Sequence, residues 1–599
     1  EAMGTEMPRR CPSCKHCKEC QFRMDSLTFK ENKEYEIILD NLKYDKIKKK
    51  FIASYPFCLS PSTLMDNYRQ AESIMFRQER RLIKTKRLEE FNEQFQDAVN
   101  RGVFKELGEH EIKEWKGPVN YIAMVEAFKS GPSVTTPLRI CMNSSLVQPP
   151  PVKKSLNDCL IKGPSALADL FTVTLGMREY QFALTKDLSK FYQCVEADEL
   201  AQNLRRIVWR FGELEDKPRI FKTTTVNFGD RPAGCIAIAA ARLTADMFGQ
   251  DKREAAWFLK NRTYVDDATA GADSMAELKQ LSHDLEAIVA PGGFKFKETM
   301  MSGDKVEDAD NVGKVLGLRW NTEADTLSVD VKLNFGGKVK GAKLEPDADL
   351  EADDISECIP DKITKRILWR VAMAQYDPLG LLSAYTIKFK LLMRNLAEES
   401  GKTLGWDEEV GPVSEAAFKQ ILEDLGDLRR LNFRRSIKPP PHMGKWKGEP
   451  MLLVFGDGSR EASCALAYAR WEMESGKVWC QLIAGKTKVA PKVKISIPRV
   501  ELVGSQLAVR LARKVKHSLR MNFGKTFFFT DSSVVLGMIN QESAKFNEFV
   551  GTRLSEIRSH SNPEEEWFWI PTDCNLADMG TRPTVRPGCL LYTSPSPRD

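Results

Sequence analysis

Apolar and polar positions follow two different patterns in the first half of the chain. Residues 28–100 are charged and helix-like, and within them Leu88–Asn100 has apolar residues at helical spacing. Gly102 follows this run and predicts the end of a helix. Phe182–Lys186 is instead a short apolar run that is typical of a strand. Helices and strands are therefore expected in mixed order.

The second half of the chain continues this mixture. Residues 361–396 are strongly helical in pattern, with a break at Asp377-Pro378-Leu379-Gly380. After residue 450 we expect strands at 451–456, 465–471, 477–484, 527–529 and 566–571, and helices that begin at Pro498 and Asn575. The first three of these strands predict an antiparallel meander.

Acidic residues stand at two places among the earlier elements. Asp187 follows the strand at 182–186, and Asp266-Asp267 follow Tyr264-Val265 at the expected tip of a β-hairpin. Carboxylate oxygens are the ligands that hard divalent cations prefer, and paired metals about 3.5–4 Å apart drive in-line phosphoryl displacement. An acidic pair alone is common in solvated turns. Asp187 in a matching setting favours a two-metal site.

Four further acids lie on the later elements in the order D, E, D, D. Asp457 ends the strand at 451–456, and Glu501 is expected in the first turn of the helix that Pro498 opens. Asp531 follows the strand at 527–529, and Asp578 lies at the start of the last helix. Any one of them would more often be a helix cap or a surface charge. Together they predict a second metal site.

The composition favours a polyanionic partner and argues against a membrane-spanning segment. The 599 residues suffice for about three or four domains, and the net charge of +6 suits a polyanionic partner. No apolar run approaches the ~20 residues that cross a bilayer, so we expect no membrane partner. Ten of the 14 cysteines are scattered, which is typical of free thiols in a reducing compartment such as the cytoplasm.

The remaining four cysteines stand close together near the N-terminus. Cys11, Cys14, Cys17 and Cys20 are each separated by two residues, a spacing that can close a tetrahedral Zn²⁺ site. The same spacing also occurs among iron–sulfur ligands, although the following proline and a second cluster sequence are absent. Zinc is the preferred interpretation, and a terminal arm without metal is an equal alternative.

The acidic sequences of the first half resemble those of reverse transcriptases. Asp187-Leu188-Ser189-Lys190-Phe191-Tyr192 is similar to the first acidic motif of that family, and Tyr264-Val265-Asp266-Asp267 is similar to the second. The resemblance implies a polymerase in which Asp187 and Asp266 hold two Mg²⁺ ions while Asp267 supports the hairpin. Its partners would be an RNA template, a DNA primer and dNTPs.

The resemblance also implies residues that contact the substrate. Arg139, on a fingers strand at 136–143, would meet the triphosphate, and Tyr192 would be the steric gate against a ribose 2′-hydroxyl. Phe228-Gly229 would lie close to template and nucleotide, and either Lys297 or Lys295 would protonate the leaving pyrophosphate. Each could instead be an ordinary surface or core residue. Asp230 and Arg231 receive no role from this resemblance, and Leu316–Trp320 resembles the strand that holds the primer end.

The four later acids resemble those of ribonucleases H, in which four carboxylates hold two Mg²⁺ ions around a phosphate of an RNA–DNA hybrid. The loop at 570–574 lacks the histidine that many of these enzymes have. Asp377-Pro378-Leu379-Gly380, followed by Trp406-Asp407, resembles the Bel/Pao class of long-terminal-repeat retrotransposons. That resemblance implies a Pol polyprotein fragment, with an aspartic peptidase and an integrase as other products and a virus-like particle as its setting.

The expected fold class is α+β multidomain: a fingers-palm-thumb reverse transcriptase, a connection region and an RNase H-like α/β domain. The expected domains are a Cys-rich arm at 1–30, a basic helical lead-in at 31–87, fingers and palm at 88–330, thumb and connection at 331–448, the RNase H-like domain at 449–585, and a foreign-looking tail at 586–599. The alternatives are a decayed or co-opted nucleic-acid-binding relic and a non-LTR or intron-type reverse transcriptase. Intact acids argue against the first, and the fused RNase H argues against the second.

Overall fold

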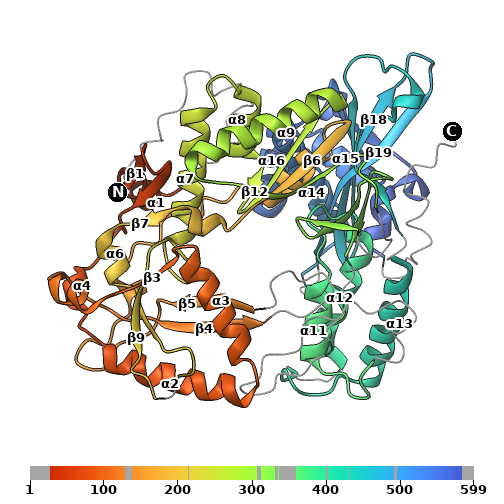
Figure 1. Ribbon diagram of the computed structural model, residues 1–599. Helices are drawn as coiled ribbons and strands as arrows, with labels where there is room; N and C mark the ends of the chain where they lie inside the picture. Colours follow the sequence, from red (N-terminus) through yellow and green to blue (C-terminus); the bar gives the residue numbers. More distant parts are fainter. Residues whose placement is uncertain are drawn as a thin grey trace. The chain divides into compact units, whose positions relative to one another are not determined.

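The structure is a computed structural model that describes residues 27–128, 138–213, 215–306, 312–330, 333, 335, 359–399, 403–428, 431–491 and 495–582. The cysteines expected to bind zinc and the tail at 586–599 lie outside these residues. Helices and strands are mixed along the chain (Figure 1), which confirms the predicted α+β class. None of the helices in the described ranges is long and apolar enough to span a bilayer.

The bounds of the elements are as follows. Up to residue 168 they are α1 (Phe29–Asp40), β1 (Leu42–Asp45), β2 (Lys50–Ala53), α2 (Tyr68–Lys84), α3 (Leu88–Asn100), β3 (Phe104–Glu106), α4 (Glu109–Glu114), β4 (Ala123–Phe128) and β5 (Leu138–Asn143). From 169 to 330 they are α5 (Leu170–Met177), β6 (Phe182–Leu188), β7 (Glu196–Ala197), α6 (Glu199–Asn203), β8 (Arg206–Trp209), β9 (Arg219–Thr223), α7 (Ala233–Phe248), α8 (Arg253–Asn261), β10 (Thr263–Tyr264), β11 (Asp267–Ala272), α9 (Met275–Val289), β12 (Phe296–Met301), β13 (Gly313–Val315), β14 (Leu318–Asn321) and β15 (Thr326–Val329). From 359 onward they are α11 (Lys365–Ala374), α12 (Ser383–Glu399), α13 (Pro412–Leu428), β16 (Phe433–Arg434), β17 (Met451–Gly458), β18 (Ala462–Glu472), β19 (Val478–Val489), α14 (Ile497–Ser518), β20 (Lys525–Thr530), α15 (Ser533–Ile539), α16 (Glu548–His560), α17 (Pro563–Glu566) and β21 (Trp567–Trp569).

Two compact units divide the chain. The first consists of residues 1–168, 186–268 and 279–299, and the second of residues 169–185, 269–278 and 300–599. The two sheets that carry the predicted acids have the strand orders β10-β11-β6-β12 and β19-β18-β17-β20-β21. The first three strands of the second sheet form the predicted antiparallel meander.

Several local expectations prove wrong. Residues 42–53, within the stretch expected to be helix-like, form the β1–β2 hairpin. Leu316 and Gly317 are the turn between β13 and β14 rather than part of a strand, and both have positive φ angles. Glu501 lies just beyond the first turn of α14, because the helix begins at Ile497. The expected strand at 566–571 is limited to β21.

The core of the first unit contains a cluster of aromatic rings around α3. Phe91 and Phe95 are fully buried one helical turn apart, as the apolar spacing of this helix requires. Their rings pack on Trp209 of β8, and Phe95 also packs on Phe104 and Phe221 of the sheet β3-β9-β8. The predicted helix at 88–100 is therefore confirmed and is held by the rings that made its pattern apolar.

In the second unit, the Asp-Pro-Leu-Gly break joins α11 and α12 and lies against the edge strand β19. The Asp377 carboxylate accepts hydrogen bonds from the backbone N–H groups of Leu381 (2.9 Å) and Leu382 (2.7 Å). The backbone N–H of Gly485 in β19 donates to the carbonyl of Leu379 (2.9 Å). Gly380 has a φ of +69°, and a Cβ at this position would lie 2.0 Å from the carbonyl oxygen of Gly485. Only glycine allows this backbone-to-backbone approach.

Gly380→Ala is therefore expected to destabilise the second unit by about 3 kcal/mol, since it adds a steric overlap to an unfavourable φ. Gly476→Ala is the matched control, because Gly476 lies in the same unit and also has a positive φ of +80°, but nothing apart from its chain neighbours lies within 4 Å of the place that its Cβ would take. It should cost only about 1 kcal/mol. Thermal unfolding followed by circular dichroism compares the two, and equal losses would contradict the close approach.

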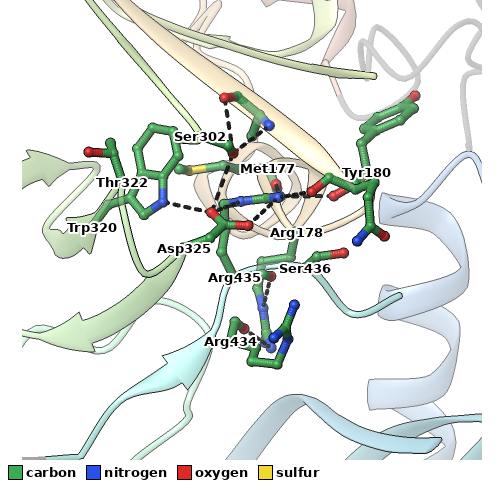
Figure 2. A network of polar contacts seen from close by, with 12 residues as sticks. Met177, Arg178, Tyr180, Ser302, Trp320, Thr322, Asp325, Arg434, Arg435 and Ser436 are labelled. Carbon is green, nitrogen blue, oxygen red and sulfur yellow. Dashed lines mark hydrogen bonds and ion pairs between the residues drawn. The ribbon is translucent and has the colours of Figure 1, made fainter. Parts of the chain in front are cut away.

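Two buried arginines hold the base of α5 in the same unit (Figure 2). The Arg435 guanidinium donates to the carbonyls of Met177 (2.7 Å), Tyr180 (3.0 Å) and Gln181 (2.6 Å), and it pairs with the Asp325 carboxylate. Arg178 donates in turn to the carbonyls of Arg435, Leu482 and Ile483. Met177 is the last residue of α5, and the last carbonyls of a helix have no partner within it, so Arg435 satisfies a group that would otherwise be buried unpaired.

Candidate active sites

The first acid site is built on the β10–β11 hairpin and the end of β6. Tyr264 pairs with Asp267 across the hairpin, so Val265 and Asp266 form its turn. Val265 has a φ of +57°, which is unusual for a β-branched residue and places backbone strain at the tip. The backbone N–H of Leu188 donates to the carbonyl of Asp266 (2.8 Å), which fixes the turn beside Asp187. The hairpin expected from the sequence is confirmed.

The pKa values of all three carboxyl groups are raised, and neighbouring acids contribute to the shift at two of them. Burial raises the pKa of Asp267 to about 7, with the charges of Asp266 and Asp187 adding to the effect. Burial also raises the pKa of Asp187, to which the Asp266 charge contributes, and it raises the pKa of Asp266. Carboxylates that share a partly buried site repel one another unless a cation lies among them. The arrangement therefore favours binding of positive charge.

Two basic residues act on the same carboxylates. The charge of Arg139 on β5 lowers the pKa of both Asp187 and Asp266 against the larger effect of burial. Lys297 on β12 lowers the pKa of Asp187 in the same way, and its own ammonium group pairs with Glu298 at 2.6 Å. The backbone N–H of Ser189 donates to the carbonyl of Lys295 (2.8 Å), which ties the end of β6 to the start of β12. The structure thus brings Arg139 and Lys297, two basic residues predicted to contact the substrate, to the acid site.

The predicted gate residue lies beside the predicted nucleotide loop. The ring centroids of Tyr192 and Phe228 are 4.4 Å apart, and burial and the charge of Asp266 raise the pKa of the Tyr192 hydroxyl. Phe228 is 52% exposed although it is a large apolar residue. Gly229 has a φ of +108°, and a Cβ there would lie 1.8 Å from the carbonyl oxygen of Met142. An exposed aromatic surface therefore lies close to the acids.

The second acid site lies at one end of the sheet in the second unit. β17 and β20 are parallel neighbours with Phe455 opposite Phe529, and the same register continued sets Asp457 opposite Asp531. Gly504 of α14 packs so closely on β17 that a Cβ would lie 2.2 Å from the Asp457 carbonyl oxygen, which brings the helix that carries Glu501 to this strand. Asp578 lies in a short 3₁₀ helix, Leu576–Gly580, rather than in a longer predicted helix.

Charge interactions connect these acids. Burial raises the pKa of Asp457 to about 6, with the charges of Asp531 and Asp578 adding to the effect and a hydrogen bond from Thr581 opposing it. Burial also raises the pKa of Asp578, while Arg582, which donates to its carboxylate at 2.8 Å, lowers it. Asp457, Asp531 and Asp578 are therefore close enough to repel one another, as the three acids of the first site do.

Hydrogen bonds that the sequence did not reveal orient the acids of the second site. The Ser532 hydroxyl donates to Glu501 (2.6 Å), and the Asn575 amide donates to Asp531 (3.1 Å) and to the Gly456 carbonyl (3.3 Å). The Thr581 hydroxyl donates to the Asp457 carboxylate. Each of these three residues lies within three positions of one of the acids along the chain, and this proximity is the only signal that the sequence offers for them.

The donor sets suit a hard divalent cation, since both consist of carboxylate oxygens gathered at the end of a sheet. No group of three or more His, Cys, Asp or Glu side chains in the described part of the chain is already arranged to hold a metal ion. The cysteines expected to bind zinc cannot be compared with this result, because they lie outside those residues.

Residues 364–532 match the family model described as the Pao retrotransposon-like RNaseH-like domain. No curated protein matches the chain. Among solved structures, a foamy viral protease-reverse transcriptase dRH in complex with double-stranded DNA is 12% identical, with a TM-score of 0.51 and coverage of 96% of this chain and 84% of that chain.

Two further foamy viral protease-reverse transcriptase structures are each 11% identical, with a TM-score of 0.50 and coverage of 95% of this chain. The match covers 64% of the chain in the complex with an RNA/DNA hybrid and 99% of the chain in the complex with double-stranded DNA. Identities this low establish the fold alone. The match at residues 364–532 bears out the Bel/Pao resemblance for that part of the chain, which is similar to the Pao retrotransposon-like RNaseH-like family, and the described chain has a fold similar to that of the foamy viral protease-reverse transcriptases.

Proposed function

We propose that the chain is an RNA-directed DNA polymerase that also hydrolyses the RNA strand of an RNA–DNA hybrid. The observation that carries this proposal is the gathering of Asp187, Asp266 and Asp267 where β6 meets the β10–β11 hairpin, with pKa values raised by burial and, for Asp187 and Asp267, also by the neighbouring acids. The second acid site repeats this arrangement within the sheet of the RNase H-like fold. The expected domain boundaries and the polyprotein partners, an aspartic peptidase and an integrase, belong to the same proposal.

Mg²⁺ fits both donor sets. Asp187 and Asp266 would hold it in the polymerase site, and the nuclease ligands would be Asp457, Glu501, Asp531 and Asp578. When bound, the ions would stabilise the charge that develops on the phosphoryl oxygens and lower the pKa of the attacking hydroxyl or water. The hydrogen bonds from Ser532, Asn575 and Thr581 would hold the nuclease carboxylates in place for this task.

Side chains around the polymerase acids would bind the nucleotide. The guanidinium of Arg139 matches phosphate geometry, and Lys297 would supply a second positive charge and a proton for the pyrophosphate. The Tyr192 ring, backed by Phe228, would occupy the space that a ribose 2′-hydroxyl needs. The polymerase would therefore discriminate against ribonucleotides by steric exclusion.

An exposed surface formed by α11 and the segment around Trp406 supports a nucleic-acid partner. Trp369 and Trp406 are 40% and 48% exposed and form an edge-to-face pair. Lys365 and Arg366 lie over the Trp406 ring at 5.2 and 5.7 Å from its centroid. Exposed aromatic rings beside basic groups are typical of surfaces that contact nucleic-acid backbone and bases. This surface would bind the RNA–DNA hybrid.

One preparation of the protein tests both activities. It should extend a DNA primer on an RNA template with dNTPs and Mg²⁺, and it should cleave labelled RNA in an RNA–DNA hybrid. Omitting Mg²⁺ should stop both reactions. A folded protein that binds the hybrid but does neither would be a non-catalytic relic.

Tyr192→Val is expected to increase ribonucleotide incorporation relative to deoxyribonucleotide incorporation, because it removes the ring that blocks the 2′-hydroxyl. In single-nucleotide insertion, the kcat/KM for the ribonucleotide divided by that for the deoxyribonucleotide should rise by at least about 10-fold. Tyr192→Phe keeps the ring and is the matched control, so its ratio should stay within about 2-fold of the parent. An unchanged ratio in Tyr192→Val would assign Tyr192 to core packing.

A further inference from the structure

Asp230 is a buried acid that receives no role from the resemblance to reverse transcriptases. Its side chain and that of Arg205 are both 0% exposed, and the two groups form an ion pair of 2.7 Å. The Asp230 carboxylate also accepts hydrogen bonds of 2.5 Å from the hydroxyls of Tyr55 and Ser144. Four residues that are far apart in the sequence therefore meet at one carboxylate, and all of them lie in the first compact unit.

These partners connect the two segments that carry the proposed nucleotide contacts. Ser144 directly follows β5, the strand of Arg139, and Asp230 directly follows Phe228-Gly229. The backbone of β5 makes a second connection, because the N–H of Met142 donates to the carbonyl of Phe228 (3.2 Å). The bond from Ser144 to Asp230 thus closes a small ring of contacts between strand and loop.

The loop is also held from its other side. The Asn157 amide group donates to the carbonyl of Gly229 (2.8 Å), and its oxygen accepts from the N–H of Arg231 (2.8 Å). The positive φ of Gly229 leaves the backbone next to the Met142 carbonyl, where no side chain fits. A loop with this conformation persists only where its surroundings fix it. The buried carboxylate of Asp230 supplies the strongest of these contacts, since charge-assisted hydrogen bonds exceed neutral ones.

We propose that Asp230 is a positioning residue for the incoming nucleotide, which locks the strand of Arg139 to the loop of Phe228. Asp230 is buried and does not itself reach the nucleotide. It acts by fixing the distance between Arg139, whose guanidinium would bind the triphosphate, and Phe228, whose ring packs on Tyr192. This inference rests on the proposed polymerase function and adds to it the residue that sets nucleotide affinity.

Single-nucleotide insertion kinetics on a primed RNA template test the proposal. Ser144→Ala removes the bond between β5 and Asp230 and leaves the ion pair in place. It should raise the KM for the dNTP about 10-fold while kcat stays within about 3-fold, because misplaced contacts weaken binding more than chemistry. Asp230→Asn should raise this KM at least as much. If Asp230→Asn does not fold, because Arg205 is left unpaired in the interior, Ser144→Ala decides the matter.

Two controls separate positioning from loss of stability. Tyr55→Phe removes one hydrogen bond from the same carboxylate but leaves the contact with β5, so its KM should stay within about 2-fold of the parent. Glu79→Gln breaks another buried ion pair of the first unit, with Arg210, and should lower the melting temperature without a change in KM.

The outcomes distinguish this inference from the proposed function. An active parent whose KM is unchanged in Ser144→Ala and in folded Asp230→Asn would overturn the role of Asp230 alone. Equal rises of KM in Tyr55→Phe and Ser144→Ala would also overturn it, because both would then reflect stability. A folded parent that extends no primer would overturn the polymerase function together with this role.

Discussion

Asp266→Asn is expected to slow primer extension on an RNA template by at least about 100-fold. The substitution keeps the volume of the side chain and removes a charge from the turn at which three carboxyl groups gather. Removing one group that stabilises developing charge in a transition state commonly costs this much. Single-turnover extension in Mg²⁺ measures the loss.

Asp246→Asn provides the matched control for this experiment. Asp246 is an acid of the same compact unit that pairs with Lys260 on the surface, and no role is predicted for it. Its variant should extend the primer at the parental rate. If Asp266→Asn extends as fast as Asp246→Asn, the assignment of the polymerase site is wrong.

RNA cleavage should be lost in Asp531→Asn, by at least about 100-fold, while DNA synthesis continues. Asp531 lies opposite Asp457 in the continued register of β20 and β17, and its carboxylate accepts a hydrogen bond from Asn575. The polymerase acids belong to the other compact unit, and changes at sites without shared partners usually act independently. A few-fold drop in synthesis is still expected, since both sites would hold one duplex through phosphate contacts.

The two activities are measured on the same RNA–DNA substrate, with labelled RNA for cleavage and labelled primer for synthesis. Glu542→Gln changes an exposed acid of the same unit and should leave both rates unchanged. Loss of synthesis together with cleavage in Asp531→Asn, in protein that is folded by circular dichroism, would mean that the nuclease site is elsewhere.

The elements with a clear apolar pattern were predictable. The helix at 88–100, the hairpin around Asp266 and the strands that precede Asp457 and Asp531 all follow from periodicity and position. Each of these patterns is local, because it depends on residues within one or two turns or strand repeats. Charged residues 42–53 lack such an apolar pattern, and their strand β2 also pairs with β7, which is distant in the sequence, so the hairpin that they form was not predicted.

The contacts that hold the proposed sites in place were not predictable. Asp230 meets Tyr55 and Ser144 across 175 and 86 positions, and no pattern in one sequence marks such pairs. The hydrogen bonds of Arg178 and Arg435 to distant carbonyls have the same origin. Buried charge is unfavourable unless it is paired. Asp230, Arg178 and Arg435 would therefore be assigned to the surface from the sequence alone, because their partners are known only from the fold.

The hydrogen bonds of Arg435 have a consequence for folding during translation. The carbonyls of Met177, Tyr180 and Gln181 accept from a guanidinium that is translated more than 250 positions later. At roughly 5–20 residues per second, this delay is on the order of 10 to 50 s. During that time the nascent chain exposes the unfinished end of α5 to water and to chaperones. A polypeptide released before Arg435 would keep this end unsatisfied, so residues 169–185 should be more sensitive to protease in such a product than in the full chain.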